Sequence, residues 1–255
     1  MTQVYLQEDQ PSNVPPLRLT GERTLPDLPA ENYWFRRHLA VYEWIAARIA
    51  GQCVVDMACG EGYGAHELAK RAAKVYGVDA NPEAYEHARL RYRSSNLSFK
   101  RALVEEFKPA DSVDAVVFLQ TVEHLQEPQP VLEHFASLLT PGGLCFVSTP
   151  NRLTLAPPGA ERSDNPWHVR EYDAAEFREL IESVFADVKL FGLFHARRLR
   201  VHEIALGLGW DSVHKQLGLT ERFYDRFTPA IRSSDFALRE GNLDRALDFL
   251  AVARQ

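Results

Sequence analysis

The chain has 255 residues, of which 45% are hydrophobic and 25% charged, and its formal net charge is −6. This is the balance of an ordinary globular protein that is long enough for one large domain. The acidic charge argues against a nucleic-acid-binding protein, because such proteins contact phosphates through a basic face.

The N-terminal segment is rich in proline. Proline lacks a backbone N–H and restricts φ, so residues 1–30 are predicted to form an extended arm. Its prolines stand at positions 11, 15, 16, 26 and 29. Residues 31–255 are then expected to form one domain, beginning with a helix from Glu31 to about Ile49, where apolar residues recur at helical spacing.

Strand-like and helix-like segments alternate after this helix. The predicted strands are Cys53–Met57, Val75–Val78, Leu97–Ala102, Val113–Leu119, Leu144–Ser148, Val188–Phe191 and Ala246–Ala253. The alternation predicts an α/β fold with a mostly parallel sheet and right-handed crossovers, closed by an antiparallel last strand. A segment at about 194–242 interrupts the alternation and is predicted to be a helical cap inserted before that strand.

The strongest motif follows the first predicted strand. From Val54 to Gly64 the sequence reads VVDMACGEGYG, so Asp56 precedes glycines at 60, 62 and 64. Glycines let the backbone turn tightly and approach a ligand. Dinucleotide sites use GxGxxG instead, and a carboxylate at position 56 would repel a pyrophosphate. The motif therefore favours a cationic ligand, such as the amino group and sulfonium of S-adenosylmethionine.

A second acid ends the next predicted strand. Asp79 stands nineteen positions after Gly60. An acid about 20 residues after the first glycine can bind both hydroxyls of a ribose. The alternative is that Asp79 caps the helix that begins after Asn81. Because the glycine motif is in register with it, we favour ribose binding.

Together these motifs resemble those of class I S-adenosylmethionine-dependent methyltransferases, over most of the chain. The resemblance implies a Rossmann-like, seven-stranded sheet in the order 3-2-1-4-5-7-6, with the cofactor at the carboxyl ends of strands one, two and four. Leu103 stands where family members often carry an Asp near the adenine, so backbone groups of Leu103 and Val104 are expected there. The implied cofactor-binding residues are Asp56, Ala58, Gly60, Gly62, Asp79, Ala80, Leu103, Val104 and Gln120.

A further cluster follows the fourth predicted strand. If the chain turns into a helix there, Gln120, Glu123 and His124 share one face. The pattern resembles the ExxEH motif of ubiquinone-biosynthesis O-methyltransferases and small-RNA 2′-O-methyltransferases, with Gln120 in place of the first Glu. That resemblance implies a Mg²⁺ site with His168 as the fourth ligand; the alternative is that the segment packs around the site without a metal. His124 or His168 could instead be the catalytic base that accepts a proton from a hydroxyl.

Segments near both ends of the domain resemble a narrower family. Together with the GEGYG loop, several segments are similar to sugar O-methyltransferases of actinobacterial polysaccharide synthesis, of the 6-O-methylglucose lipopolysaccharide type. These segments run from Leu19 to Asp27, from Glu31 to His38, from Ser148 to Asn151, from His168 to Glu171 and from Gly192 to His195. This implies O-methylation of a sugar or a glycosylated small molecule. Tyr33 and Trp167 are candidate acceptor contacts, because aromatic faces stack on sugar rings.

Several alternatives stay open. The xxEH pattern also fits a phenolic or quinone-like acceptor, and a non-catalytic, cofactor-binding scaffold would carry the same glycine motif. An NAD-dependent oxidoreductase is disfavoured by the glycine spacing and by Asp56. The expected partner is a small-molecule or oligosaccharide acceptor, with no nucleic acid, and a homodimer is an open alternative.

Three scattered cysteines without a CxxC pattern exclude a disulfide framework and a zinc site. Met1–Gln10 is polar and does not resemble a signal peptide. No apolar run reaches the ~20 residues of a membrane helix. These features predict a cytoplasmic protein without a membrane span.

Overall fold

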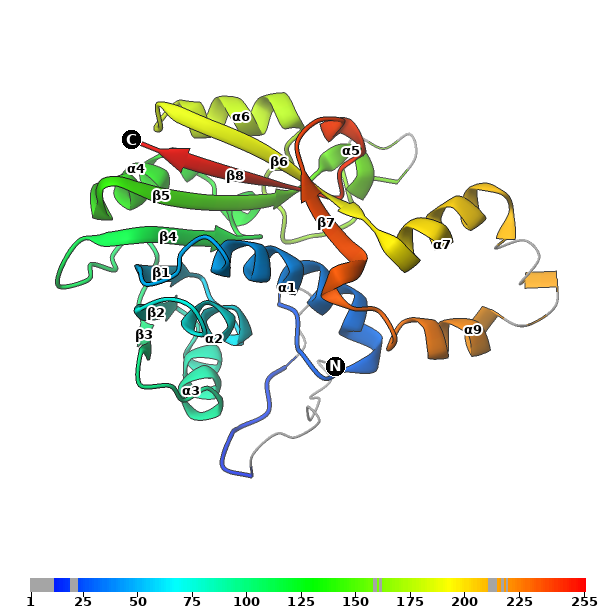
Figure 1. Ribbon diagram of the computed structural model, residues 1–255, viewed down its shortest axis with the longest axis horizontal. Coiled ribbons are helices and arrows are strands. Elements are labelled where there is room, and N and C mark those ends of the chain that lie inside the picture. Colours follow the sequence, from blue (N-terminus) through cyan, green and yellow to red (C-terminus); the bar gives the residue numbers. More distant parts are fainter. Residues whose placement is uncertain are drawn as a thin grey trace.

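The computed structural model describes residues 12–18, 23–157, 160, 162–210, 215–216, 218 and 220–255. Its centre is a mixed, eight-stranded sheet in the order β3-β2-β1-β4-β5-β8-β6-β7 (Figure 1). The strands β1 to β5 pair in parallel, whereas β8 is antiparallel to both β5 and β6. Their bounds are β1 Cys53–Met57, β2 Lys74–Asp79, β3 Leu97–Arg101, β4 Val113–Leu119, β5 Leu139–Pro150, β6 Asp187–His195, β7 Phe236–Arg239 and β8 Asp248–Arg254.

Helices cover both faces of the sheet. On one face, Ala115 and Val117 of β4 pack in a core cluster with residues of α1, α2 and α3. On the other face, Val116 and Phe118 pack with residues of α4 and α6. The bounds are α1 Asn32–Ala46, α2 Tyr63–Ala69, α3 Pro82–Arg91, α4 Pro128–Leu138 and α6 Ala174–Glu182. Burial on both faces explains why the central strands are continuous apolar runs in the sequence.

The predicted seven-stranded sheet is wrong in the number of its strands. The added strand β7 pairs antiparallel with Gly192–His195, so β6 is also longer than predicted. The segment 194–242 contains α7 (Arg197–Gly207) and α9 (Thr220–Phe227), but its end forms β7 and joins the sheet edge. Residues 211–214, 217 and 219 of this segment lie outside the described residues. Four residues with only partial burial give a weak strand signal, which is why β7 was missed.

The described part of the predicted arm runs along the domain without a helix until Pro29–Glu31, a short 3-10 helix before α1. Leu17, Leu25 and Leu28 form a small apolar cluster of their own. Residues 1–11 and 19–22 of the predicted arm lie outside the described residues. Among the helices of the described ranges, none combines the length and the apolar character needed to cross a membrane.

Candidate functional site

The glycine loop after β1 is shaped by two glycines with positive φ. Gly62 has φ 97°, and a Cβ atom there would lie 2.8 Å from the Cβ of Ala88, so the loop can pass this close to α3 only with glycine. Gly60 has φ 56°, but a Cβ atom there would meet nothing within 4 Å. The loop is therefore closely packed against α3 at Gly62, and it has open space next to Gly60.

The two acids of the motif lie beside this loop. Asp79 accepts hydrogen bonds from the backbone N–H groups of Gly60 and Asn81, each at 2.8 Å. Asp56 is fully buried, and its Oδ1 accepts a hydrogen bond of 3.2 Å from the hydroxyl of Tyr42. The Oδ2 atom of Asp56 has no hydrogen-bond partner among the described residues. A buried carboxylate oxygen without a partner is costly, which prepares this position for a cation.

Burial raises the pKa of Asp56 to about 8; the hydrogen bond from Tyr42 opposes the shift, and the nearby charge of Asp79 adds to it. The carboxyl group is therefore mostly protonated at neutral pH until a positive ligand lies next to it. Asp56 and Asp79 lie near the ends of β1 and β2, two neighbouring parallel strands in which Asp56 is paired with Gly77.

Backbone strain is concentrated at the same edge of the sheet. Ala58, just after β1, has φ 56°, and Gln120, just after β4, has φ 51°. Left-handed conformations cost a non-glycine residue about 1–3 kcal/mol and tend to cluster at functional sites. Both residues line a narrow cavity of about 80 Å³, which we call the cofactor cavity.

The cofactor cavity also carries a positive group. Its lining consists of Arg23, Thr24, His38, Tyr42, Ala58, Cys59, Gly60, Glu61, Tyr63, Leu119, Gln120 and Thr121. The Nη1 atom of Arg23 is buried and has no hydrogen-bond partner among the described residues. Because a guanidinium is always charged, Arg23 gives this cavity a cation, and Tyr42, which also lines it, bonds the buried carboxyl group of Asp56.

Three predicted cofactor contacts lie farther along the sheet edge. Ala80 directly follows β2, and Leu103 and Val104 come shortly after β3. None of the three lines the cofactor cavity, and the side chain of Leu103 is 50% exposed. Of the other predicted contacts, Ala58, Gly60 and Gln120 line this cavity, whereas Asp56, Gly62 and Asp79 do not line it themselves. Asp56 and Asp79 are bonded to two residues that do, Tyr42 and Gly60.

A second and larger cavity of about 590 Å³ adjoins the first, and we call it the acceptor cavity. It is lined by Arg23, Thr24, Glu31, Trp34, His38, Gln120, Glu123, His124, Pro150, Leu155, Ser163, Asn165 and His168. Four of these residues, Arg23, Thr24, His38 and Gln120, also line the cofactor cavity. The two cavities therefore meet at these four side chains.

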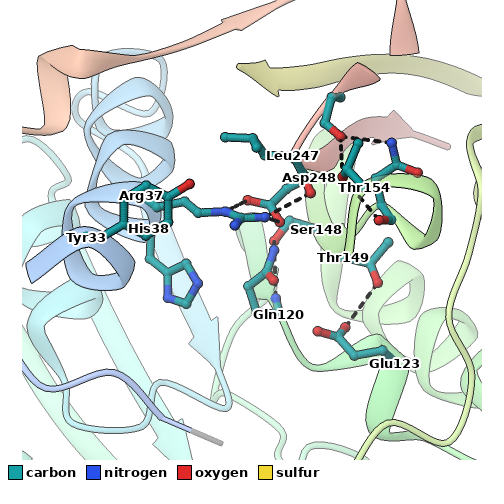
Figure 2. A network of polar contacts seen from close by, with 12 residues as sticks. Tyr33, Arg37, His38, Gln120, Glu123, Ser148, Thr149, Thr154, Leu247 and Asp248 are labelled. Atoms are coloured by element: carbon teal, nitrogen blue, oxygen red, sulfur yellow. Dashed lines mark hydrogen bonds and ion pairs between the residues drawn. The ribbon is translucent and has the colours of Figure 1, made fainter. Parts of the chain in front are cut away.

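The prediction that Gln120, Glu123 and His124 share a helical face is wrong. The positive φ of Gln120 prevents an α-helix there, and a 3-10 helix covers only Val122–His124. The side-chain amide of Gln120 donates instead to the hydroxyl of Ser148 at 3.1 Å (Figure 2).

Glu123, His124 and His168 nevertheless come together. The backbone N–H groups of Val169 and Arg170 donate to the carbonyl of Glu123 at 2.8 and 3.1 Å, which docks the His168 segment. One potential ligand atom from each of Glu123, His124 and His168 lies within 4.8 Å of the others. Two imidazoles and one carboxylate form a donor set that fits a divalent metal ion.

Hydrogen bonds orient the members of this cluster. Nδ1 of His124 lies 2.9 Å from the carbonyl oxygen of Trp167, which can only accept, so Nδ1 carries the proton. Nδ1 of His168 lies 2.8 Å from a carboxylate oxygen of Glu171. Burial raises the pKa of Glu123 to about 8, against the hydrogen bond that Thr149 donates to it. A bound cation would reverse this effect and favour the ionised carboxylate.

The two aromatic residues predicted to contact the acceptor line neither cavity. The hydroxyl of Tyr33 lies 2.8 Å from Nε2 of His195, and its ring packs against Phe236. Trp167 is half exposed and contributes its backbone carbonyl to His124. Trp34, next to Tyr33, lines the acceptor cavity instead.

A buried ion pair fixes α1 against the strand ends. Nε and Nη2 of Arg37 donate to the two carboxylate oxygens of Asp248 at 2.7 and 2.6 Å, and Nη2 also donates to the carbonyl of Leu247 (Figure 2). Both side chains of the pair are almost fully buried. Because His38 follows Arg37 on α1, the pair also sets the position of His38. Sequence analysis missed this pair, and it assigned no role to Arg23, for which the proline-rich arm offers no signal.

Comparisons with known proteins agree with the geometry of the cofactor cavity. Residues 55–147 match the family model described as a methyltransferase domain. A probable S-adenosylmethionine-dependent methyltransferase of Mycolicibacterium smegmatis is 39% identical over 253 residues, which are 95% of this chain and 98% of that relative. A ubiquinone biosynthesis O-methyltransferase of Xanthomonas axonopodis is 36% identical over 129 residues, covering 47% of this chain and 54% of that protein.

The fold also resembles that of a solved methyltransferase structure. The crystal structure of an S-adenosylmethionine-dependent methyltransferase from Thermotoga maritima superposes with a TM-score of 0.59 at 16% identity, over 89% of this chain and 94% of that one. The identity over nearly the whole chain, the matching domain model and the glycine loop with its two acids lead to one conclusion. The chain belongs to the S-adenosylmethionine-dependent methyltransferases.

Proposed function

We propose that this methyltransferase transfers the methyl group to a hydroxyl of a sugar or of a glycosylated small molecule. The observation that carries the proposal is the acceptor cavity, in which ten of the thirteen lining residues are polar. Such a lining can hydrogen bond several hydroxyls, while Trp34 offers a ring face for stacking. The similarity to a ubiquinone O-methyltransferase supports an oxygen acceptor and favours a phenol as the second candidate.

The cofactor cavity suits the aminoacyl end of S-adenosylmethionine. In the proposed placement, Asp56 binds the α-amino group, Arg23 binds the carboxylate and Asp79 binds the ribose hydroxyls. The unpaired atoms of Asp56 and Arg23 support it, because together they complement a zwitterion. The adenine would then lie toward Ala80, Leu103 and Val104, at the ends of β2 and β3.

The four residues shared by both cavities define where the methyl group passes. The sulfonium lies on the cofactor side, the acceptor hydroxyl on the other, and the oxygen attacks the methyl carbon in line with the leaving sulfur. Much of the rate enhancement comes from this alignment. The attacking hydroxyl must also lose its proton to a base.

Glu123, His124 and His168 would hold a divalent metal ion, and Gln120 stays bonded to Ser148. When bound, the ion supplies a positive charge that lowers the pKa of an acceptor hydroxyl. Imidazole nitrogens suit Mn²⁺, Fe²⁺ or Zn²⁺ better than Mg²⁺, which prefers oxygen ligands. The donor set therefore shifts the expected metal away from the Mg²⁺ implied by the sequence resemblance.

The function is tested with methyl-labelled S-adenosylmethionine and two acceptors, methyl α-D-glucoside and catechol. We expect label in the glucoside. Label only in catechol would favour the phenolic candidate. Binding of S-adenosylhomocysteine without transfer to either acceptor would favour the scaffold.

Replacing Arg23 by alanine is expected to weaken binding of S-adenosylhomocysteine by about 10- to 100-fold, because a charge-assisted hydrogen bond is lost. Methylthioadenosine, which lacks the carboxylate, should bind both proteins equally in calorimetric titrations. Arg36→Ala is the matched control, because Arg36 bonds Asn32 on its own helix and lines neither cavity. Equal loss of affinity for both ligands would contradict the assignment.

Binding of S-adenosylhomocysteine is expected to release a proton from Asp56, whose pKa of about 8 must fall when the amino group arrives. Affinity should rise with pH by up to about tenfold per unit until pH 8. In the free protein, the free energy of unfolding changes with pH in the opposite direction to the affinity. Since the folded chain keeps a proton that the unfolded Asp, with a pKa of about 3.9, has lost, the free energy of unfolding falls as pH rises from about 4 to 8. Calorimetric titrations in buffers of different ionisation enthalpy measure the number of protons released on binding. The Asp56→Asn variant should release none from this position.

Removal of metal is expected to reduce methyl transfer by about 10-fold or more, with activity restored by Mn²⁺ or Zn²⁺ rather than by Mg²⁺. The measurement is turnover after dialysis against a chelator, followed by addition of each ion. His168→Ala should weaken metal binding in the same titration. Full activity in the presence of chelator would show that methyl transfer does not need a metal ion bound by Glu123, His124 and His168.

A further inference from the structure

We propose that His38 is the catalytic base of methyl transfer and that Thr24 orients it. This inference rests on the proposed function, because the base takes the proton of a hydroxyl acceptor. It replaces both histidines that the sequence favoured, His124 and His168, which line the acceptor cavity alone.

His38 lies where a base for this reaction is needed. The base must lie where the acceptor hydroxyl meets the methyl group, at the junction of the two cavities. Of the four side chains at that junction, those of Arg23, Thr24 and Gln120 have no basic lone pair that could take the hydroxyl proton. The neutral imidazole of His38 has one.

Contacts at Nδ1 orient the imidazole of His38. Nδ1 of His38 lies 3.2 Å from Oγ1 of Thr24 and 3.4 Å from the hydroxyl of Tyr63. When Nδ1–H donates to the oxygen of Thr24, Nε2 carries the free lone pair. Figure 2 shows the imidazole of His38 projecting away from α1, and His38 lines the acceptor cavity together with Gln120 and Glu123.

The charge state of His38 also fits this role. Desolvation lowers the pKa of His38 to about 4; Asp248 opposes the shift and Arg37 adds to it, so the imidazole is neutral at physiological pH and its lone pair is free. It can take the proton although it is a weak base, because a hydroxyl oxygen that is bonding to the methyl carbon becomes strongly acidic. An imidazolium alone would be unfavourable at this position. Here it forms as the positive charge of the sulfonium disappears, so the site carries the same net charge before and after the reaction.

Methyl transfer to the hydroxyl conserves both atoms and charge. A lone pair of the acceptor oxygen forms the new C–O bond, and the electron pair of the S–CH₃ bond stays on sulfur, which leaves neutral S-adenosylhomocysteine. The hydroxyl proton passes to Nε2 of His38. The imidazolium then returns this proton to water through the acceptor cavity.

The kinetic test compares wild type with His38→Asn, whose amide can still donate to Thr24. With labelled S-adenosylmethionine and whichever of methyl α-D-glucoside or catechol is methylated, we expect kcat to fall by about 10²- to 10⁴-fold. The acceptor KM and the affinity for S-adenosylhomocysteine should change by less than about threefold, and added imidazole should restore part of kcat. His134→Asn, on α4 and outside both cavities, is the matched control and should keep its kcat. An unchanged kcat in His38→Asn overturns the proposal.

A second measurement needs no acceptor. Nitrogen-15 NMR of the S-adenosylhomocysteine complex should show His38 neutral at pH 7 with its proton on Nδ1. Thr24→Val should lose this preference and lower kcat by about tenfold, whereas Thr24→Ser should keep both. If wild type methylates neither acceptor, the proposed function fails, and the tautomer then tests separately whether Thr24 orients His38. A proton on Nε2 in the wild-type complex leaves no lone pair there for the hydroxyl proton and overturns the role of His38 as the base.

Discussion

Replacing Asp248 by alanine is expected to lower the free energy of unfolding by about 3–5 kcal/mol. The change removes the counter-ion of the buried guanidinium of Arg37, which keeps the carbonyl of Leu247 as a hydrogen-bond acceptor and the ring of Trp34 as a neighbour. A buried charge without its counter-ion costs several kcal/mol, which is a large share of the stability of an ordinary domain. Urea denaturation followed by circular dichroism measures the loss.

Two comparisons separate charge from packing. The double variant Arg37→Met, Asp248→Leu should recover most of the lost stability, because it buries apolar groups in place of an unpaired ion. At the surface, Glu182→Ala breaks the half-exposed pair with Arg178 and should cost only about 0–1 kcal/mol. A loss below about 1 kcal/mol in Asp248→Ala would contradict the assigned importance of the pair. Since the pair positions α1, Asp248→Ala should also reduce turnover.

Replacing Asp56 by asparagine is expected to weaken binding of S-adenosylhomocysteine by about 100-fold, equivalent to about 2.7 kcal/mol. The amide keeps the shape of the side chain and can still accept the hydrogen bond from Tyr42, but it loses the charge that attracts the amino group. Stability should move in the opposite direction. At pH 8 and above, the variant should be at least as stable as wild type, because it no longer buries a carboxylate oxygen without a partner.

The matched control for this prediction is Asp114→Asn. Asp114 lies on β4 and accepts hydrogen bonds from the backbone N–H of Cys53 and from Thr140, outside both cavities. That variant should lose stability and keep its affinity within about twofold. Calorimetric titration and thermal unfolding of both variants test the pair of predictions. Wild-type affinity in Asp56→Asn would remove Asp56 from the cofactor site.

The sequence predicted the parallel part of the sheet well, for a physical reason. Strands such as Val113–Leu119 are buried on both faces, so their apolar runs are long. The edge strand Phe236–Arg239 is short and only partly buried, so its pattern is weak. A strand was predictable from the sequence where both of its faces are buried. It was not predictable for the four-residue edge strand β7, which forms by pairing with β6.

The candidate site was predictable only where the chain is locally continuous. The glycine loop and Asp56 lie within one strand and turn, and Asp79 follows at the next strand end. The Arg37–Asp248 pair joins residues 211 positions apart, and no local pattern marks either of them. Likewise, Gln120 has a left-handed φ and its backbone N–H donates to the hydroxyl of Ser148, 28 residues away. The predicted helical face took no account of this long-range contact. Long-range contacts of this kind also bring Arg23 and His38 to the junction of the cavities.

The most direct test is a calorimetric titration of the purified wild-type chain with S-adenosylhomocysteine, with NAD as the comparison ligand. Saturation at one molecule per chain, at micromolar concentration and with no heat from NAD, is the predicted result. An absence of binding up to millimolar S-adenosylhomocysteine would contradict it, because Asp56, Arg23 and Asp79 would then surround no aminoacyl nucleoside.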